Sequence, residues 1–454
     1  MSTQPELASF DPKTVRVFRY VARSFEEPTA TARFRYAVGD HELEEVFEFV
    51  GPREPLTPAG AAALDRVLRH LFLAAGLSYY KLAAPPTVVV GEPLSEADLE
   101  FYARLYRSGL AEFAFTNHLE GWDAPRFAVS DDRVPVPVTG LSLADRPLVP
   151  LGGGKDSVVA VDLLRAAGRD PLLLTVNRPP AIERVVLETG LEDRLVRRTL
   201  DPRLHALTRA GGMNGHVPVT AIVSLASVAA AILHGVDAVV MANERSASAP
   251  SFEWNGLAVN HQYSKGIEFE RDLRALLARD VSPELQWFSL LRPFSELQIV
   301  RHFASLPGYH HVVTSCNRAF ALDAARRSVG WCADCPKCRF VFLALACFLP
   351  RTDVVSIIGH DLLDDDAQVP GYLALLGIDA VKPLECVGEV EESRAAAEVL
   401  LERPEWEGAR VVEAIRARLD ATLRAGPQAL AALLAPSSEH HVPAAYRSAL
   451  DALR

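Results

Sequence analysis

The chain has 454 residues, which is enough for two or three domains. Hydrophobic residues make up 49% of it and charged residues 23%, which is typical of a globular protein and excludes a largely disordered chain. The formal net charge of −11 argues against a nucleic-acid partner, because proteins that bind the phosphate backbone usually carry a basic excess or patch.

The ends of the chain and its cysteines indicate a cellular compartment. The first residues, MSTQPELASF, have neither the basic nor the apolar region of a secretory signal. No apolar run approaches the ~20 residues that span a bilayer. The six cysteines lie in the C-terminal third, and clustered thiols in an unsecreted chain favour a metal site or chemistry over disulfides. We therefore expect a cytoplasmic protein with no membrane partner, and the oligomeric state stays open.

Residues 1–122 are expected to form a small α+β domain. Thr31–Val38 and Leu43–Val50 alternate apolar and polar residues around a Gly-Asp pair, a pattern typical of a β-hairpin. Ala61–Ala75 has helical periodicity, and a Ser-Glu-Ala-Asp capping box opens a second helix, Glu96–Arg107.

After a Pro-rich linker at residues 123–147, short apolar strands alternate with helices over residues 148–350. This alternation predicts an α/β domain with a parallel sheet, whose ligands bind at the carboxyl ends of the strands. Residues 351–454 are expected to be a mostly helical C-terminal region. The expected strands are Leu148–Leu151, Leu172–Val176, Leu195–Thr199 and Ala238–Ala242, and the helices are Val158–Ala167, Ile182–Glu188, Thr220–Leu233, Glu268–Ala278 and Glu296–Ser305.

The most informative stretch is PLVPLGGGKDSVVAV, where a strand runs through three glycines into a helix. Consecutive glycines let backbone N–H groups point into one concavity, and the helix N-terminus adds positive partial charge. Asp156 would repel a phosphate unless a cation lay between them, which predicts a polyphosphate bridged by magnesium on Asp156. The candidate phosphate-binding residues are Gly152, Gly153, Gly154, Lys155, Asp156 and Ser157.

This loop resembles the SGGxDS loop of the N-type ATP pyrophosphatases, also called PP-loop enzymes, with Gly152 in place of the first serine. The resemblance implies a HUP-like, parallel-sheet ATP-binding domain at residues 148–350. It also implies cleavage of ATP between the α- and β-phosphates to activate a substrate group as an adenylate. The alternative is a Gly-rich turn that binds no ligand.

A polar segment, NERSASAPSFEWNGLAVNHQYSKGIEFE, follows the strand that ends at Ala242. A long polar loop at the carboxyl end of a parallel strand usually forms a substrate site, and the alternative is a solvated surface loop. A second loop, GGMNGH, either presents backbone donors to an anion or is a flexible connection. These two loops contain Asn214, His216, Asn243, Glu244, Arg245, Asn260, His261, Tyr263 and Lys265.

Several segments together resemble the ATP-dependent UDP-N-acetylmuramoyl-L-alanyl-L-glutamate epimerases over roughly residues 15–420. They are SYYK at 78–81, GGGKDS, NGHVPVTA at 214–221, NERSAS at 243–248 and NHQYSKGIEFE at 260–270. The resemblance implies that the terminal L-Glu of a nucleotide-linked muramoyl dipeptide becomes D-Glu, with ATP, magnesium and water used and AMP and pyrophosphate released. The reaction would serve peptidoglycan precursor synthesis, and hence cell-wall biogenesis and cell shape.

The implied chemistry assigns roles to these residues. An acyl adenylate removes the charge of the carboxylate, so the α-proton becomes acidic, and two acid/base groups should flank the α-carbon. The catalytic candidates are Glu244, His261 and Lys265, with Tyr263 as a further proton-transfer candidate and Asp156 at the phosphates. The substrate-binding candidates are Asn214, His216, Asn243, Arg245, Asn260 and Tyr263; Arg245 could pair with a carboxylate through its planar fork. A core or surface role is the alternative for each.

Other functions stay open at this point. Another PP-loop adenylating enzyme, ligase or deazaguanine-synthase-like, would act on a different carboxylate, and a nucleotide-binding sensor would keep only the fold. The aromatic segment Tyr79-Tyr80-Lys81 is the ground for a hypothesis that the N-terminal domain binds the sugar-nucleotide part of the substrate.

The sequence WCADCPKC places three thiols at C-x2-C-x2-C spacing, and Cys316 upstream is a plausible fourth. Four thiolates suit tetrahedral zinc, so Cys316, Cys332, Cys335 and Cys338 are candidates for a closed structural zinc site. The deazaguanine branch of the pyrophosphatases has a similar cluster. The alternative is a set of reduced structural cysteines.

Overall fold

A computed structural model describes residues 9–129, 134–320, 327–378, 382–420, 422–426 and 428–453. The strands are β1 (Val17–Glu26), β2 (Thr31–Val38), β3 (His41–Val50), β4 (Thr87–Val90), β5 (Arg126–Val129), β6 (Ala144–Pro150), β7 (Leu172–Val176), β8 (Asp193–Thr199), β9 (Val236–Met241), β10 (Phe252–Trp254), β11 (Leu257–Val259) and β12 (Gln286–Ser289).

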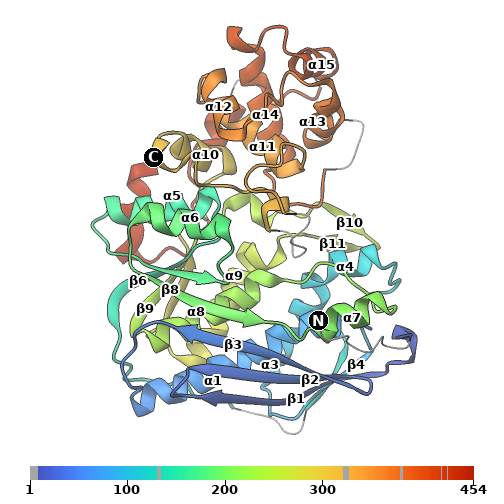
Figure 1. Cartoon of the computed structure of the whole chain (residues 1–454), viewed down its shortest axis with the longest axis vertical. Helices are drawn as coiled ribbons and strands as arrows, with labels where there is room; N and C mark the ends of the chain where they lie inside the picture. Colours follow the sequence, from blue (N-terminus) through green and yellow to red (C-terminus); the bar gives the residue numbers. More distant parts are fainter. Residues whose placement is uncertain are drawn as a thin grey trace, which may run out of the picture. The chain divides into compact units, whose positions relative to one another are not determined.

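The strands form one large sheet and a small one (Figure 1). The large sheet has the order β12-β9-β6-β7-β8-β3-β2-β1-β4-β5, and β10 pairs with β11. Strands β1, β2 and β3 pair antiparallel, whereas β6 pairs with β9 and β4 pairs with β1 and β5 in parallel. The chain is therefore an α/β protein with a large, mostly parallel sheet, as the alternation of strands and helices predicts.

The chain folds into two compact units, each assembled from stretches that are distant in sequence. The first unit contains residues 1–148, 194–239 and 252–287, and the second contains residues 149–193, 240–251 and 288–454. The expected division at residues 122, 147 and 350 stays a prediction. Strand β5 lies inside the expected linker, and residues 130–133 of that linker lie outside the described part of the chain.

The first unit confirms the expected hairpin and capping box. Strands β2 and β3 pair from Thr31↔Glu48 to Val38↔His41, and Gly39 in the turn has a left-handed φ of 59°. Ser95 and Asp98 make both reciprocal bonds of a capping box at the start of α3. The helices of this unit are α1 (Pro58–Ala75), α2 (Leu77–Tyr80), α3 (Glu96–Gly109), α4 (Ala111–Thr116), α7 (Arg203–Arg209), α8 (Val219–Leu233) and α9 (Ile267–Leu276).

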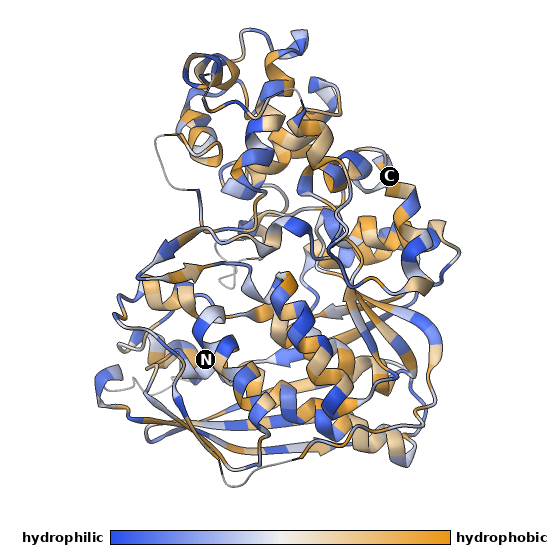
Figure 2. Cartoon of the chain, turned by 180° about the vertical axis from the view of Figure 1, so that it is seen from behind, coloured by the Kyte–Doolittle hydropathy of each residue, from blue (hydrophilic) through white to orange (hydrophobic). Residues whose placement is uncertain are grey.

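Aromatic rings fill the core of the first unit between β1–β2 and α1. The ring of Tyr36 stacks on that of Tyr79 with centroids 4.8 Å apart, and the ring of Tyr80 lies edge-on to that of Tyr106 at 4.7 Å. Tyr79 and Tyr80 are both buried. Their burial removes the ground for a sugar-nucleotide site on these rings, because they pack the core instead of facing a ligand. Figure 2 shows the alternation of hydrophobic and hydrophilic residues along the helices that cover such cores.

A charged network is buried in the same unit. Asp280 accepts hydrogen bonds from Arg69 of α1 and from His70 Nε2, and the other ring nitrogen of His70 lies 2.9 Å from the hydroxyl of Tyr102. Asp98 forms an ion pair with Arg69 as well. Burial lowers the pKa of His70 although Asp280 opposes this shift. Each charge in this network depends on a partner, because a lone ion is costly in the core.

In the second unit, α5 (Lys155–Ala166) packs against α10 (Glu296–Ala304). Figure 1 shows α11 to α15 gathered in one helical group. Helices α12 to α15 lie in the expected C-terminal region, whereas α11 precedes its expected start at residue 351. Helix α5 begins three residues before the expected start at Val158, because its first turn is polar and apolar periodicity does not reveal it. The remaining helices are α6 (Pro180–Thr189), α11 (Pro336–Leu345), α12 (Arg351–Ile358), α13 (Val369–Leu375), α14 (Val390–Leu401), α15 (Arg410–Arg418) and α16 (Ala429–Leu433).

Among the helices that the structure describes, none combines the length and the apolar composition that crossing a membrane requires.

The buried network yields a stability prediction. Asp280→Asn should lower the free energy of unfolding by about 3–5 kcal/mol, because it removes the buried charge nearest to Arg69 and leaves only the longer contact of Arg69 with Asp98. Asp65→Asn, the same change in the ion pair with Arg23 where the Asp65 side chain is 65% exposed, should cost less than about 1 kcal/mol. Equilibrium urea unfolding of both variants checks this, and equal small losses would contradict it.

Candidate functional site

The glycine loop joins β6 to α5 in the second unit. The N–H of Leu151 donates to the carbonyl of Leu174 at 2.7 Å, which ties the end of β6 to β7. Gly153 has a left-handed φ of 78°, and Gly154 occupies the N-cap of α5. Glycine has no side chain to cap the first N–H groups of the helix, and these are the donors that bind phosphate at a helix N-terminus.

The loop glycines differ in the space around them. A Cβ on Gly153 would lie 3.2 Å from Cγ1 of Ile182, and a Cβ on Gly154 would lie 3.1 Å from Oγ of Ser315. A Cβ on Gly152 would meet nothing within 4 Å. The left-handed φ and the packing therefore require glycine at position 153. A larger residue at position 154 would crowd Ser315, whereas position 152 has room for a side chain.

A cluster of carboxylates lies at the start of α5. Nζ of Lys155 is 2.5 Å from Oδ1 of Asp156 and also donates to Oε2 of Glu296 on α10. One carboxylate oxygen from each of Asp156, Glu244 and Glu296 lies within 4.8 Å of the others. Lys155, Glu244 and Glu296 are buried, so three acidic groups and one ammonium share a poorly solvated space.

Burial and charge shift the pKa values in this carboxylate cluster. Burial raises the pKa of Glu296 to about 8; Lys155 opposes this rise, while Asp156 and Glu244 add to it. Burial alone would lower the pKa of Lys155, but the charges of Asp156 and Glu296 outweigh it and raise the pKa. The cluster therefore holds more negative charge than one ammonium balances, which favours a bound cation.

The residues after β9 take distinct positions in the second unit. Glu244 joins the carboxylate cluster, while its backbone carbonyl accepts a hydrogen bond from Arg292 at 2.5 Å. The amide of Asn243 donates to Oγ of Ser289 at 2.9 Å and is buried. Arg245 donates to the carbonyls of Leu433 and Ala435, both at 3.2 Å, so its guanidinium binds backbone here.

A second polar cluster lies in the first unit. Nδ1 of His261 is 2.6 Å from Oε2 of Glu112 on α4, and the ring of His216 lies 4.4 Å from that of His261. Nζ of Lys81 donates to Oδ1 of Asn214 at 2.7 Å and to the carbonyl of Gly215 at 3.3 Å. The structure thus brings the loop with Asn214 and His216 together with His261, as a shared substrate site requires.

The other candidates from the segment after β11, Asn260, Tyr263 and Lys265, contact residues that are close to them in sequence. Oδ1 of Asn260 accepts the N–H of Gln262 at 2.7 Å, and Lys265 donates to the amide oxygen of Gln262 at 3.3 Å. Tyr263 packs edge-on to Phe269, and burial raises the pKa of its hydroxyl. These bonds fix the shape of the loop, and the phenol of Tyr263 is the weakest of the proton-transfer candidates.

Sequence motifs miss two acidic residues of these clusters. Glu296 and Glu112 lie on helices far along the chain from Lys155 and His261, their partners. In the sequence, Glu296 is indistinguishable from any acidic residue in the first turn of a helix, and Glu112 belongs to no motif. Only the fold brings them to these positions.

The cysteine cluster has the dimensions of a metal site. The Sγ atoms of Cys335 and Cys338 lie 3.4 Å apart, those of Cys332 and Cys338 3.8 Å, and those of Cys335 and Cys316 3.9 Å. The four Sγ atoms lie within 4.8 Å of one another. A tetrahedron with Zn–S bonds of about 2.3 Å has S···S edges of about 3.8 Å, so the set fits zinc.

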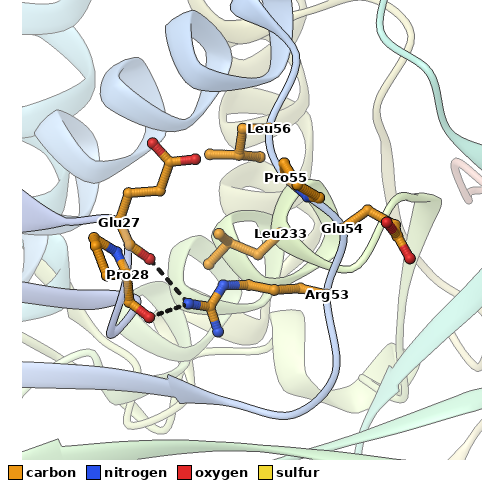
Figure 3. Close-up of a pocket in the computed structure, with 7 residues that line it drawn as sticks. All are labelled: Glu27, Pro28, Arg53, Glu54, Pro55, Leu56 and Leu233. Atoms are coloured by element: carbon orange, nitrogen blue, oxygen red, sulfur yellow. Dashed lines mark hydrogen bonds between the residues drawn. The ribbon is translucent and has the colours of Figure 1, made fainter.

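A pocket of about 500 Å³ in the first unit contains none of the predicted site residues. Figure 3 shows the Arg53 guanidinium turned to the backbone carbonyls of Glu27 and Pro28, at 2.9 and 2.8 Å. Pro55, Leu56 and Leu233 supply apolar walls. The Arg53 guanidinium already binds backbone carbonyls. This pocket is therefore a weaker candidate for the functional site than the two polar clusters.

Comparison with known proteins places the chain in a family. The model of the MurL N-terminal domain matches residues 9–290, and that of the MurL C-terminal domain matches residues 312–429. The chain belongs to the MurL family. It is 46% identical to the UDP-N-acetyl-alpha-D-muramoyl-L-alanyl-L-glutamate epimerase of Micromonospora sp., over 95% of this chain and 97% of that protein.

Two further MurL relatives carry the same name. The protein of Salinispora tropica is 45% identical over 96% of both chains. The protein of Xanthomonas oryzae pv. oryzae is 40% identical, over 97% of this chain and 98% of that one. The two matched ranges include the glycine loop, the cysteine cluster and the polar cluster of the first unit, whereas Glu296 of the carboxylate cluster lies between them.

The loop geometry predicts unequal effects of alanine. Gly153→Ala should destabilise the protein by about 1–2 kcal/mol, because a left-handed φ strains any residue with a Cβ and Ile182 is in the way. Gly152→Ala should leave stability unchanged or raise it by up to about 1 kcal/mol, since the added methyl meets open space. Urea unfolding measures both, and a larger loss for Gly152→Ala would show that the loop has another shape.

Proposed function

We propose that the protein epimerises the terminal L-Glu of UDP-N-acetylmuramoyl-L-alanyl-L-glutamate to D-Glu, with ATP converted to AMP and pyrophosphate. The reaction would be a step in peptidoglycan precursor synthesis. The three relatives named above are epimerases of this nucleotide-linked dipeptide, which favours this function over another adenylating enzyme.

The observation that carries the ATP part is the glycine loop at the N-terminus of α5, with Asp156 in a carboxylate cluster. We assign the loop to the triphosphate of ATP, in a PP-loop, HUP-like domain. The N–H groups of the first turn of α5 would bind phosphate oxygens, and Ser157 already donates to the carbonyl of Gly154 at 3.1 Å, which holds the loop closed.

Magnesium suits the carboxylate cluster. Asp156, Glu244 and Glu296 offer the hard oxygen ligands that Mg²⁺ prefers, and their charge exceeds that of the Lys155 ammonium in contact with them. When held by Asp156, Glu244 and Glu296, the ion would supply positive charge that offsets the charge of the phosphates. This assignment gives Glu244 a role at the metal instead of at the α-carbon.

The energetic need for ATP follows from the substrate. Removing an α-proton beside an ionised carboxylate would create a dianion, so the barrier is high. An acyl adenylate removes that charge, and its carbonyl takes up the electron pair of the broken C–H bond. Protonation from the opposite face gives the D-epimer, and water then releases AMP. Of the two proton-transfer candidates from the sequence, we keep His261, whereas Lys265 donates to the amide oxygen of Gln262 in its own loop. Asn214, His216 and Asn260 stay our candidates for substrate binding.

We further propose that Cys316, Cys332, Cys335 and Cys338 bind one structural zinc ion. The four Sγ atoms lie within 4.8 Å of one another, and Sγ of Cys316 also lies 3.7 Å from Oγ of Ser328. The ion would tie the segment before α11 to the residues after α10, and would leave no open position for catalysis.

The zinc assignment gives a metal-content prediction. The purified protein should contain about one zinc per chain, and Cys338→Ser should reduce this several-fold and lower the thermal unfolding midpoint. Cys347→Ser removes a thiol that hydrogen bonds to backbone carbonyls, so it should keep the metal. Elemental analysis of the Cys338→Ser and Cys347→Ser proteins measures their zinc content. A full zinc content in Cys338→Ser would reject the four-cysteine zinc site.

The proposed function predicts ATP-dependent exchange at the α-carbon. In D₂O with ATP and magnesium, the wild-type protein should incorporate deuterium at the glutamyl α-carbon and release AMP and pyrophosphate. Asp156→Ala should lose both activities, whereas Asp353→Ala, an exposed acidic residue of the same unit, should keep them. Mass spectrometry of the dipeptide measures exchange. ATP cleavage by the wild type without exchange would exclude the epimerase mechanism.

A further inference from the structure

Several ionisable side chains gather near the imidazole of His216 in the first unit. The ring of His261 lies 4.4 Å from that of His216, Glu112 contacts His261 at 2.6 Å, and Lys81 binds the neighbouring residues Asn214 and Gly215. These groups come from four separate stretches of the chain. This concentration of acid and base groups indicates a functional site. It includes Lys81 and Glu112, which sequence motifs do not connect with His261.

Lys81 and His261 approach the same short segment from different elements. Lys81, which follows α2, binds Asn214 and the carbonyl of Gly215, whereas His261, which follows β11, contacts the ring of His216. Both groups therefore border the segment 214–216, Lys81 at Asn214 and Gly215 and His261 at His216. Two bases that act on opposite faces of one α-carbon must each come within hydrogen-bond reach of the proton that they transfer.

Glu112 determines which nitrogen of His261 exchanges protons. Its carboxylate accepts a hydrogen bond from Nδ1 of His261 at 2.6 Å, so Nδ1 carries hydrogen and Nε2 is the basic nitrogen. The negative charge also stabilises the imidazolium that forms when Nε2 accepts a proton. Glu112 is therefore a positioning residue that acts through His261.

We propose that Lys81 and the Glu112-oriented His261 are the two proton-transferring groups of the epimerase, one for each face of the glutamyl α-carbon. The proposal rests on the proposed function. One group takes the α-proton while the C–H electron pair moves into the activated carbonyl as an enolate. The other then delivers a proton to the opposite face, and the carbonyl re-forms.

The electrostatics of Lys81 suit this role. Burial, together with the charge of Arg198, lowers the pKa of the ammonium to about 8, so a useful fraction is neutral amine near neutral pH. Abstraction by Lys81 should therefore rise with pH through about 8. Burial lowers the pKa of His216 to about 4, with His261, Lys81 and Lys265 adding to the shift and Glu112 opposing it. His216 is thus a neutral neighbour and a weaker base.

The test uses both epimers of the substrate. Each is incubated with ATP and magnesium in D₂O, and deuterium incorporation is expressed per pyrophosphate released. Lys81→Arg keeps charge and hydrogen bonding but cannot lose its proton. It should lower exchange at least about 100-fold with one epimer and retain exchange without inversion with the other. His261→Gln should show the opposite preference.

Matched controls and a pH profile separate catalysis from folding. Lys13→Arg and His118→Gln alter exposed residues of the same unit and should exchange both epimers normally. Glu112→Gln should shift the pH dependence of the His261-dependent exchange to lower pH, because the charge that favours the imidazolium is gone. A purely structural role would instead lower the rate equally at all pH values.

The possible results separate the proposed function from the assignment of Lys81 and His261 to the two faces of the α-carbon. Absence of ATP-dependent exchange in the wild type would reject the proposed function itself. Normal exchange in the wild type, with Lys81→Arg and His261→Gln affecting the same epimer, both epimers or neither, would overturn only the assignment of the two faces.

Discussion

The placement of the Lys155 ammonium between Asp156 and Glu296 is the constraint on which the candidate phosphate site depends. Helix α5 starts with this lysine buried, and burial is tolerable only because α10 supplies a carboxylate opposite to it. That contact fixes α5 against α10 at the end where the glycine loop enters. The carboxyl groups of Asp156, Glu244 and Glu296 lie around the single ammonium of Lys155. This excess of acidic groups favours a bound cation at the start of α5.

The two polar clusters have opposite electrostatic characters. In the second unit, burial and the neighbouring carboxylates raise the pKa of Glu296, because so much negative charge is confined there with one ammonium. In the first unit, burial and neighbouring cations lower the pKa values of Lys81 and His216, which favours their neutral, basic forms. On the proposed function, the first environment would suit a cation with a polyphosphate, and the second would suit removal of a carbon-bound proton.

The sequence predicts local features well and distant partnerships poorly. The hairpin around Gly39 and the capping box at Ser95 depend on neighbouring residues, and both are confirmed. The glycine loop was recognisable because its conformational requirement is local, as the left-handed φ of Gly153 shows. Helix α5 began earlier than expected, since the polar residues of a first turn do not follow the apolar period.

The partners Glu296 and Glu112 could not be predicted, because nothing local distinguishes a glutamate that pairs with a distant residue from a surface glutamate on a helix. Tyr79 and Tyr80 illustrate the converse error, since aromatic residues beside a lysine suggested a ligand-binding surface but pack the core. Their burial has a consequence for the neighbouring residue. A rigid aromatic anchor holds α2 in place, so Lys81 leaves the core at a fixed point, with its ammonium on the Asn214–Gly215 segment.

The substitution of Gly152 for the serine of the PP-loop pattern also has a physical explanation. Gly152 is exposed and faces open space, whereas Gly153 is constrained by φ and by Ile182. A serine at 152 would therefore add a hydroxyl donor without shaping the loop, and its loss costs one contact to a ligand and not the fold. On the proposed function, the backbone N–H groups at the start of α5 and a cation at Asp156 would then supply most of the binding energy for a phosphate. The acidic cluster at this helix start is thus the feature that a loop with three glycines can least do without.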